Sequence, residues 1–468
     1  MLADRGQIAR MNPLFGNLRS DVSGIVWPPL ARNTAALIHA YAARLSETQW
    51  LDPAEIAAHQ RRQLGVLAQH CAQHSPAFAV RLAAAGLTPA DLAEPGGLQR
   101  LPPLTRQAMQ RTDDLFCREV PNDHMPLGLN STSGSTGEPV KVHRTALNHL
   151  GWMAMTLRDH QWQRRDSQLR LAGMSAHFHA IKAADDWGPP ISTLFETGPG
   201  LSFPATLDIA RMLPLLREFR PQILVTYPSV LGALLDRIER AGSGLDDLRH
   251  VRCMSEMVSP DLRVRAQAQL GIRLADAYSS EECGFIALQC PDDAGGYHAM
   301  AETIWLEIVD DAGQPCAPGE MGRVLVTDLH NFATPLIRYD IGDFAVAGGA
   351  CPCGRGLPRI ERIVGHERNL VCKPDGSRHW PLTGYPRYRA IAPVRQYQLI
   401  QHDLAIVEMR LVTERTLTAD EEAGLAAQVC QSLGHDFAIR FVYFSGRLPL
   451  GTGGKFEEFV SHVKDRQD

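Results

Sequence analysis

The stretch NSTSGSTGEPVKVHRT, Asn130 to Thr145, gathers five hydroxyl side chains and two glycines between Ser131 and Gly137, shortly before a proline. Backbone N–H groups and Ser/Thr hydroxyls can surround phosphate oxygens, and glycine lets the main chain approach them closely. The spacing matches neither the G-x-x-x-x-G-K-[ST] pattern of a Walker loop nor the G-x-G-x-x-G of a dinucleotide-binding turn. Taken alone, the stretch is equally compatible with a solvent-exposed turn. Other parts of the chain must decide between these interpretations.

Length and composition restrict the class of protein. The chain has 468 residues, 44% of them hydrophobic, and a formal net charge of −5. It is long enough for about three folding units at most, and it shows no electrostatic footprint for nucleic acid or an anionic membrane. No signal-peptide core and no membrane-length apolar run occur. We therefore expect a soluble cytoplasmic protein with reduced cysteines, with no nucleic-acid or membrane partner, and the sequence leaves a homodimer open.

The first 110 residues predict mostly helices. PAEIAAHQRRQLGVLAQHCAQH, Pro53 to His74, has apolar residues at steps of three and four, as one buried helix face requires. LTPADLAEP, Leu87 to Pro95, combines a threonine cap with a proline in the first helical turn. These patterns indicate a helical N-terminal segment of about 110 residues.

From about Asn130 onward, short apolar runs alternate with helical patterns. The expected strands are PQILVTYPS (221–229), TIWLEIVD (303–310) and RVLVTDL (323–329), and the expected helices are ARMLPLLREF (210–219) and SVLGALLDRIERA (229–241). This alternation predicts an α/β fold with substantial sheet.

The composition changes after RIERIVGHERN, which ends at Asn369. The expected elements beyond it are QYQLIQHD (396–403), LAIVEMRLVT (404–413), the helix ADEEAGLAAQVCQSL (419–433) and FAIRFVYF (437–444). We predict a large N-terminal multi-sheet α/β domain, residues 1–366, joined by a hinge to a small mobile C-terminal α+β domain, residues 367–468.

Four segments in order carry a family resemblance. TSGSTGEP (132–139), YSSEECG (278–284), PLIRYDIGD (335–343) and PLGTGGKFEEF (449–459) resemble the signatures of the acyl-adenylate-forming (AMP-binding) enzyme superfamily. PLTRQAMQ (103–110) and CPCGRGLPRIERIVGHERN (351–369) resemble its phenylacetate–CoA ligase branch. The resemblance spans about Gln60 to Phe459 and implies that the stretch at Ser131–Gly137 is a phosphate loop.

The resemblance implies a two-step reaction. A carboxylate attacks the α-phosphorus of ATP to form acyl-AMP and pyrophosphate, and the thiol of coenzyme A then displaces AMP. ATP, Mg²⁺, coenzyme A and a small carboxylic acid are the implied cofactors and substrates. In such chemistry the protein mainly positions groups and stabilises developing negative charge. By resemblance, the β- and γ-phosphates lie against Ser133, Gly134, Ser135, Thr136 and Gly137.

Two residues are implied to be catalytic. Glu282, fifth in its motif, would hold Mg²⁺, which prefers carboxylate and phosphate oxygens. The alternative is a solvated carboxylate at a helix start, since Glu281 is adjacent. Lys455 would be the transition-state cation, because a lysine on a glycine-rich loop is a compact charge with a long reach. The alternative for Lys455 is a solubilising surface residue.

Three further residues would bind the nucleotide. Tyr278 would stack near adenine, or else be a core aromatic; Asp343 would accept hydrogen bonds from the ribose, or else belong to a turn. Arg338 is assigned with them, but could equally be a structural ion-pair partner.

The chain departs from the family pattern at three positions. Glu138 stands where relatives often carry lysine, while His366 and Arg368 occupy the hinge positions of the usual arginine and first aspartate. Arg368 could still act as the pivot.

The cysteine pattern suggests a metal site. Three thiolates and one imidazole complete a tetrahedral set for structural Zn²⁺ that would brace the fold without taking part in the chemistry. The alternative is unrelated thiols and a surface histidine. The four proposed ligands are Cys290, His298, Cys351 and Cys353.

The acid-binding pocket is expected from three segments rich in aromatic residues. An apolar pocket of this kind suits an aryl or arylacetic acid, although each residue could instead belong to the core or the surface. The candidate lining residues are His177, Phe178, His179, Trp187, Tyr227 and Pro228. Two alternative functions remain open: transfer of the acyl group to a carrier-protein phosphopantetheine, and nucleotide binding without turnover.

Overall fold

The computed structural model describes residues 18–25, 27, 29–112, 114–131, 139–175, 178–242, 244–292, 296–381, 385–446, 448–449 and 456–463. Two compact units account for the chain. The first comprises residues 1–227, 245–255 and 272–364, and the second comprises 228–244, 256–271 and 365–468. The division into domains 1–366 and 367–468 stays a prediction, and two helices from within the first of these ranges group with the second unit.

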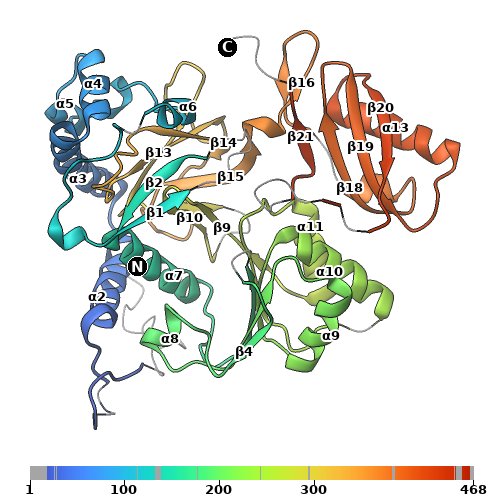
Figure 1. The fold of residues 1–468 in the computed structure, drawn as a ribbon, viewed down its shortest axis with the longest axis horizontal. Helices are drawn as coiled ribbons and strands as arrows, with labels where there is room; N and C mark the ends of the chain where they lie inside the picture. The colour runs from blue at the N-terminus through green and yellow to red at the C-terminus, as the bar shows by residue number, and fades with distance from the viewer. Residues whose placement is uncertain are drawn as a thin grey trace. The chain divides into compact units, whose positions relative to one another are not determined.

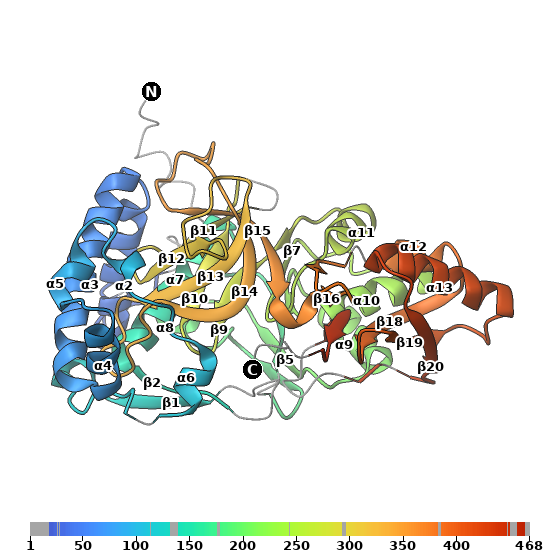
Figure 2. The same cartoon turned by 90° about the horizontal axis from the view of Figure 1, so that it is seen from above.

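The N-terminal part of the first unit is helical, and Figure 2 shows the helices labelled α2, α3, α4 and α5 gathered along one side of this unit. The helices of this part are α2 (Asn33–Thr48), α3 (Pro53–His74), α4 (Pro76–Ala84), α5 (Pro89–Ala93), η2 (Leu98–Arg100), α6 (Arg106–Gln110) and η3 (Asn122–His124). Helix α3 begins with a capping box in which Asp52 and Glu55 satisfy backbone N–H groups of the first turn.

The described strands of the first unit form two large sheets and one hairpin (Figure 1). The hairpin pairs β1 (Leu127–Ser131) with β2 (Lys141–Thr145). The seven-stranded sheet runs β12 (Ile304–Val309), β13 (Met321–Asp328), β14 (Tyr339–Ala347), β15 (Arg359–His366), β11 (Tyr297–Ala299), β10 (Gly284–Gln289) and β9 (Ala277–Ser280).

The second large sheet is mainly parallel. Its six strands run β4 (Lys182–Ala184), β5 (Gly200–Pro204), β3 (Leu171–Ser175), β6 (Ile223–Thr226), β7 (His250–Cys253) and β8 (Leu274–Ala275), and only the β4 pairing is antiparallel. Helices α7 (Ala146–Trp162), α8 (Ile191–Leu194) and α9 (Ile209–Phe219) belong to the same unit.

The second unit is a four-stranded sheet with helices. Figure 1 shows α13 (Ala419–Leu433) lying along this sheet. The sheet runs β20 (Ala438–Tyr443), β19 (Ile406–Thr413), β18 (Val394–Gln401) and β21 (Phe459–Ser461). The remaining elements are α10 (Pro228–Ala241), α11 (Pro260–Leu270), η4 (Glu367–Asn369), β16 (Val371–Cys372), β17 (Arg378–His379) and α12 (Tyr385–Arg389).

Each unit has its own apolar core. In the second unit, Leu425, Val429 and Leu433 of α13 pack with Leu399 and Met409 of the sheet. In the first unit, one core cluster includes residues of β2, β10, β13 and β14, and another fastens α3 and α4 to residues 329–337. Burying a Leu or Met side chain stabilises a fold by about 1.5–3 kcal/mol, so these clusters explain why the units are compact.

The predicted α/β fold class is confirmed, and the helices expected at Pro53–His74 and Ala419–Leu433 have those bounds. Among the described residues, no helix has both the length and the apolar character of a membrane span.

Candidate functional site

The β9–β10 turn presents Glu282, the predicted Mg²⁺ ligand. The residue is only 6% exposed, and its Oε1 lies 3.4 Å from Nη1 of Arg106 and 3.5 Å from the hydroxyl of Tyr339. The neighbouring Glu281 is exposed, as a solvated carboxylate would be. Both contacts to Glu282 are longer than a good charge-assisted hydrogen bond, so the carboxylate keeps the capacity to bind a cation.

Tyr278 and Asp343 meet in the structure although 65 residues separate them. The Tyr278 hydroxyl donates a hydrogen bond of 2.6 Å to Oδ2 of Asp343, on strand β14. Burial, followed by the charge of Asp343, raises the pKa of Tyr278 well above its usual value, so this hydroxyl stays a donor. The pair links two of the family-like segments, residues 278–284 and 335–343, through a side-chain contact between β9 and β14 of the seven-stranded sheet.

Arg106 and Tyr339 are site residues that sequence reasoning missed. Backbone hydrogen bonds from Leu104 N to Arg338 O (2.8 Å) and from Asp340 N to Leu104 O (2.9 Å) bind Leu104 to the start of β14. This pairing brings Arg106 to Glu282. The signal was present in PLTRQAMQ, which the family resemblance includes, but nothing local to that segment indicates which side chain reaches the site.

Arg338 is held by protein groups. Its Nε lies 3.2 Å from both carboxylate oxygens of Glu307, while Nη1 donates to the carbonyls of Gln99 at 2.7 Å and Leu101 at 2.8 Å. Nη2 donates to Gly313 O at 3.2 Å. These contacts support the structural ion-pair interpretation, and a role for Arg338 in nucleotide binding stays a prediction.

The predicted phosphate-loop residues 133–137 and the predicted catalytic Lys455 lie outside the described residues, but flanking segments are described. Asn130, on β1, donates from Nδ2 to Glu281 O at 3.1 Å, so the stem of the loop contacts the turn that carries Glu282.

The segment after Lys455 is anchored within the second unit. Arg368 Nε donates to Oε1 of Glu457 at 2.8 Å, and the backbone N–H of Phe456 donates to Oε1 of Glu256 at 3.0 Å. Arg368, one of the residues that departs from the family pattern, therefore contacts the segment that follows Lys455. His366 caps η4 by accepting a hydrogen bond from Arg368 N at 3.3 Å.

The predicted pocket residues do not share one environment, and His177 lies outside the described residues. Phe178 and His179 are exposed. Trp187 packs against a core cluster and donates from Nε1 to Leu169 O at 2.8 Å. Tyr227 is buried in the first unit, whereas Pro228 begins α10 of the second unit. For Trp187 these contacts favour the core interpretation, and the pocket assignment stays a prediction.

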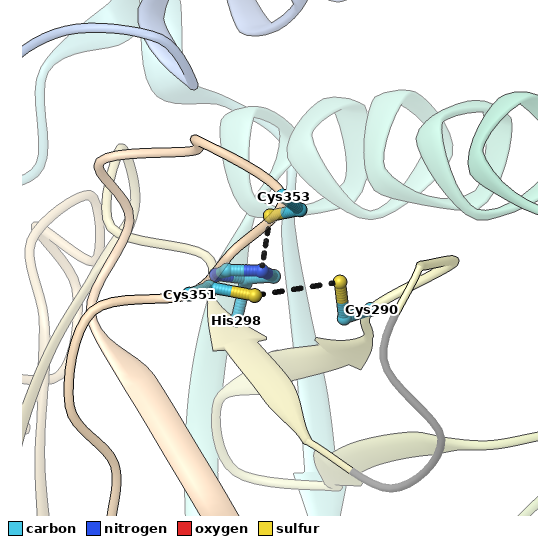
Figure 3. Close-up of side chains that lie close together, drawn as sticks. All are labelled: Cys290, His298, Cys351 and Cys353. Carbon is cyan, nitrogen blue, oxygen red and sulfur yellow. Dashed lines mark hydrogen bonds between the residues drawn. The ribbon is translucent and has the colours of Figure 1, made fainter.

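The four predicted zinc ligands converge (Figure 3). The candidate ligand atoms of Cys290, His298, Cys351 and Cys353 all lie within 4.8 Å of one another. Cys290 Sγ is 3.8 Å from Cys351 Sγ, and Cys353 Sγ is 3.3 Å from His298 Nε2. Two sulfurs bound to one tetrahedral zinc ion at about 2.3 Å lie about 3.8 Å apart, so the sulfur separation fits that ion.

The second nitrogen of His298 completes the arrangement. Nδ1 lies 3.3 Å from Leu357 O, and the side chain is fully buried. A carbonyl acceptor keeps the proton on Nδ1 and leaves the Nε2 lone pair facing the thiols, as a metal-binding imidazole requires. The donor set therefore fits structural zinc.

The fold and the candidate site can now be compared with known protein families. The family model for AMP-binding enzymes matches residues 68–333, over half of the 468-residue chain. The chain belongs to the AMP-binding enzyme family, and the predicted superfamily is confirmed.

Curated relatives place the chain on the phenylacetate–CoA ligase-like branch. Phenylacetate-coenzyme A ligase of Escherichia coli (strain K12) is 28% identical over 347 residues, covering 69% of this chain and 75% of that protein. The enzyme of the same name from Pseudomonas putida is 26% identical over 344 residues, covering 69% and 74%.

A solved structure of 2-hydroxyisobutyryl-CoA ligase with 2-HIB-AMP is similar to this chain with a TM-score of 0.68 at 17% identity, covering 90% of this chain and 92% of that one. At this identity the likeness supports the fold, which is that of adenylate-forming ligases.

Proposed function

We propose that this protein is an AMP-forming acid–CoA ligase. Its carboxylic acid substrate attacks the α-phosphorus of ATP, a bond forms between carboxylate oxygen and phosphorus, and pyrophosphate leaves. The thiolate of coenzyme A then attacks the acyl carbon and AMP leaves. The observation that supports this most is the meeting of distant family segments: Asn130 with Glu281, and Tyr278 with Asp343.

The described side chains suit separate tasks at the nucleotide. Glu282 would hold Mg²⁺, which when bound neutralises phosphate charge. Asp343, oriented by the Tyr278 hydroxyl, would accept hydrogen bonds from the ribose. Arg106, at 3.4 Å from Glu282, limits the rotation of that carboxylate. Each group is placed before substrate arrives, which is how a protein lowers a barrier without covalent participation.

Lys455 would supply the cation for the charge that develops on the α-phosphate and carboxylate oxygens. Replacing a single preorganised donor of this kind costs about 10²–10³-fold in rate. Lys455→Ala should therefore reduce acid-dependent exchange of labelled pyrophosphate into ATP by that factor, with ATP affinity and thermal stability close to wild type. An unchanged exchange rate would remove Lys455 from the mechanism.

The acid is proposed to be an aryl or arylacetic acid. This rests on the aromatic residues in the predicted pocket segments and on the names of the curated relatives. A panel of aromatic and aliphatic acids in the exchange assay tests the proposal, and a preference for aliphatic acids would contradict it.

The cysteine cluster is proposed to hold one structural Zn²⁺. Three thiolates and an imidazole leave no open coordination position, so the ion would brace the ends of β10, β11 and β15 and would not contact substrate. The proposal also includes a cytoplasmic location, where ten unpaired cysteines stay reduced.

Two alternative functions can be distinguished by experiment: transfer of the acyl group to a carrier protein instead of coenzyme A, and nucleotide binding without turnover. A carrier-protein enzyme would exchange pyrophosphate but form no thioester with free coenzyme A. A nucleotide-binding protein without turnover would bind ATP and show no exchange with any acid. We expect both exchange and acyl-CoA formation.

A further inference from the structure

The turn that carries Glu282 is fastened to both strands of the β1–β2 hairpin. Asn130 on β1 donates to Glu281 O at 3.1 Å, and Nη2 of Arg144 on β2 lies 3.4 Å from Cys283 O. The two accepting carbonyls belong to the residues immediately before and after Glu282. The hairpin's connecting segment is the one that carries Ser133–Gly137. Both strands of the hairpin therefore contact the turn that carries Glu282.

The guanidinium of Arg144 lies directly over Gly284. A Cβ added at Gly284 would approach Nη2 and Nη1 of Arg144 to 2.9 and 3.0 Å, and Gly284 has φ +75°, which also favours glycine. Ser280 closes the turn from the other side, because its Oγ accepts a hydrogen bond from Cys283 N at 3.0 Å. The backbone around Glu282 therefore has little freedom as long as Arg144 stays in place.

The buried Asp328 lies near the half-buried Arg144 and interacts electrostatically with it. Both side chains line one small cavity together with Asn148 and Cys283. Asp328 accepts hydrogen bonds from His330 N at 3.2 Å and Asn148 Nδ2 at 3.4 Å. Burial raises the pKa of Asp328 to about 6 and the charge of Arg144 opposes this shift, so Asp328 is ionised at neutral pH and attracts the guanidinium.

We propose that Arg144 is a positioning residue that fixes the backbone of the turn carrying Glu282. It does so by binding the Cys283 carbonyl from the strand that leaves the loop. The proposal rests on the proposed role of Glu282 as the Mg²⁺ ligand. Residues that orient a ligand, without touching the metal, change metal affinity by about 10–100-fold when they are replaced.

The test measures how strongly Mg²⁺ tightens nucleotide binding. Calorimetric titration with α,β-methylene-ATP, in Mg²⁺ and in EDTA, gives two affinities and their ratio without requiring turnover. Arg144→Gln should lower that ratio by about tenfold and leave the EDTA affinity unchanged. Arg144→Lys, which keeps the charge and a donor, should recover part of the loss. Arg44→Gln, on the exposed face of α2, is the matched control and should change neither affinity.

Glu282→Gln separates failure of the inference from failure of the proposed function. If Glu282→Gln leaves the ratio unchanged, the role of Glu282 is wrong and the inference falls with it. If Glu282→Gln lowers the ratio and Arg144→Gln does not, the inference alone is wrong. If both act, Arg144→Gln/Glu282→Gln should lower the ratio no further than Glu282→Gln, because the two residues act on one ligand. Additive losses would contradict the inference.

The inference stays testable even if Arg144→Gln fails to fold. Thermal unfolding is measured for each variant, and Asn130→Ala removes the other contact to the same turn without removing a charge. A folded Asn130→Ala variant should lower the ratio by about threefold. An unchanged ratio in both Asn130→Ala and Arg144→Lys would overturn the proposal.

Discussion

Strand β10 has a different group of candidate metal ligands at each of its ends. Glu282 lies in the turn that precedes Gly284, the first residue of the strand, and its described contacts are long, at 3.4 and 3.5 Å. Cys290 follows Gln289, the last residue of the strand, and lies among three other ligand-bearing side chains within 4.8 Å. Before β10, the carboxylate of Glu282 keeps the capacity to bind a cation. After β10, Cys290 belongs to a group of four side chains that is a complete ligand set for a tetrahedral ion.

The difference in ligand number indicates which end can take part in the reaction. An ion that helps phosphoryl chemistry must keep positions for substrate oxygens, so the protein supplies only one or two carboxylates. Four protein ligands fill a tetrahedral ion and exclude substrate from it. The comparison predicts that substitutions at the first end change catalysis and that substitutions at the second end change stability.

The largest expected effect is at the first end. Glu282→Ala should reduce acid-dependent pyrophosphate exchange by about 10²–10³-fold, because the phosphate charge loses its bound cation. Zinc content and the free energy of unfolding should stay close to wild type. The neighbouring exposed Glu281 gives the matched control, and Glu281→Ala should exchange normally. Equal losses in the two variants would contradict the assignment of Glu282.

At the second end, Cys351→Ser together with Cys353→Ser should remove zinc, measured as metal content per chain. The free energy of unfolding should fall by about 3 kcal/mol, because a structural metal stabilises only the folded state. Cys430→Ser, a cysteine outside the cluster, should keep both metal and stability. Well-folded protein with intact cysteines and no metal would refute the site.

Lowering the pH should change the stability contributions of two buried residues, His330 and Asp328, in opposite directions. Burial lowers the pKa of His330 to about 4, so this residue contributes stability above pH 6.5 that is lost as the pH falls. Burial raises the pKa of Asp328 to about 6, so the folded state gains stability from it as the pH falls from 6 toward 4. Each contribution amounts to about 1.4 kcal/mol per pH unit.

Urea unfolding between pH 7 and 4 checks these signs. Relative to wild type, His330→Asn should lose less stability on acidification, and Asp328→Asn should lose more. Curves that deviate from wild type in the same direction would show that burial of one of the two groups is assigned wrongly.

The smallest expected effect concerns the Tyr278–Asp343 pair. Tyr278→Phe removes the hydroxyl that donates to Asp343 at 2.6 Å and keeps the aromatic ring. Since a single hydrogen bond to a charged group is worth about 1.5 kcal/mol, the KM for ATP should rise by about tenfold with kcat nearly unchanged. A lowered kcat with unchanged KM would place Tyr278 at the reacting atoms instead.

Local patterns explain why much of the fold could be predicted. The helices at Pro53–His74 and Ala419–Leu433 have regular apolar periodicity and capping boxes at their starts, and these signals lie within the helices themselves. The grouping of α10 and α11 with the C-terminal segment has no such signal. It depends on contacts between segments far apart in the sequence.

The cysteine cluster could be predicted from its residue types alone, and the sheet explains why its members meet. Strand β11, which carries His298, pairs with both β10 and β15, so Cys290 after β10 and the Cys351–Cys353 segment before β15 arrive together. Arg106 could not be predicted in the same way. Its place beside Glu282 follows from the backbone pairing of Leu104, two residues earlier, with the start of β14, and no local sequence pattern indicates that pairing.

The most direct test of the central claim is pyrophosphate exchange into ATP, measured in parallel on wild type, Glu282→Ala and the Cys351→Ser/Cys353→Ser variant, with and without an aryl acid. We predict exchange that requires the acid, nearly disappears in Glu282→Ala and persists per folded molecule in the cysteine variant. Wild-type protein that binds ATP but exchanges no pyrophosphate with any acid would contradict the assignment of this chain as a ligase.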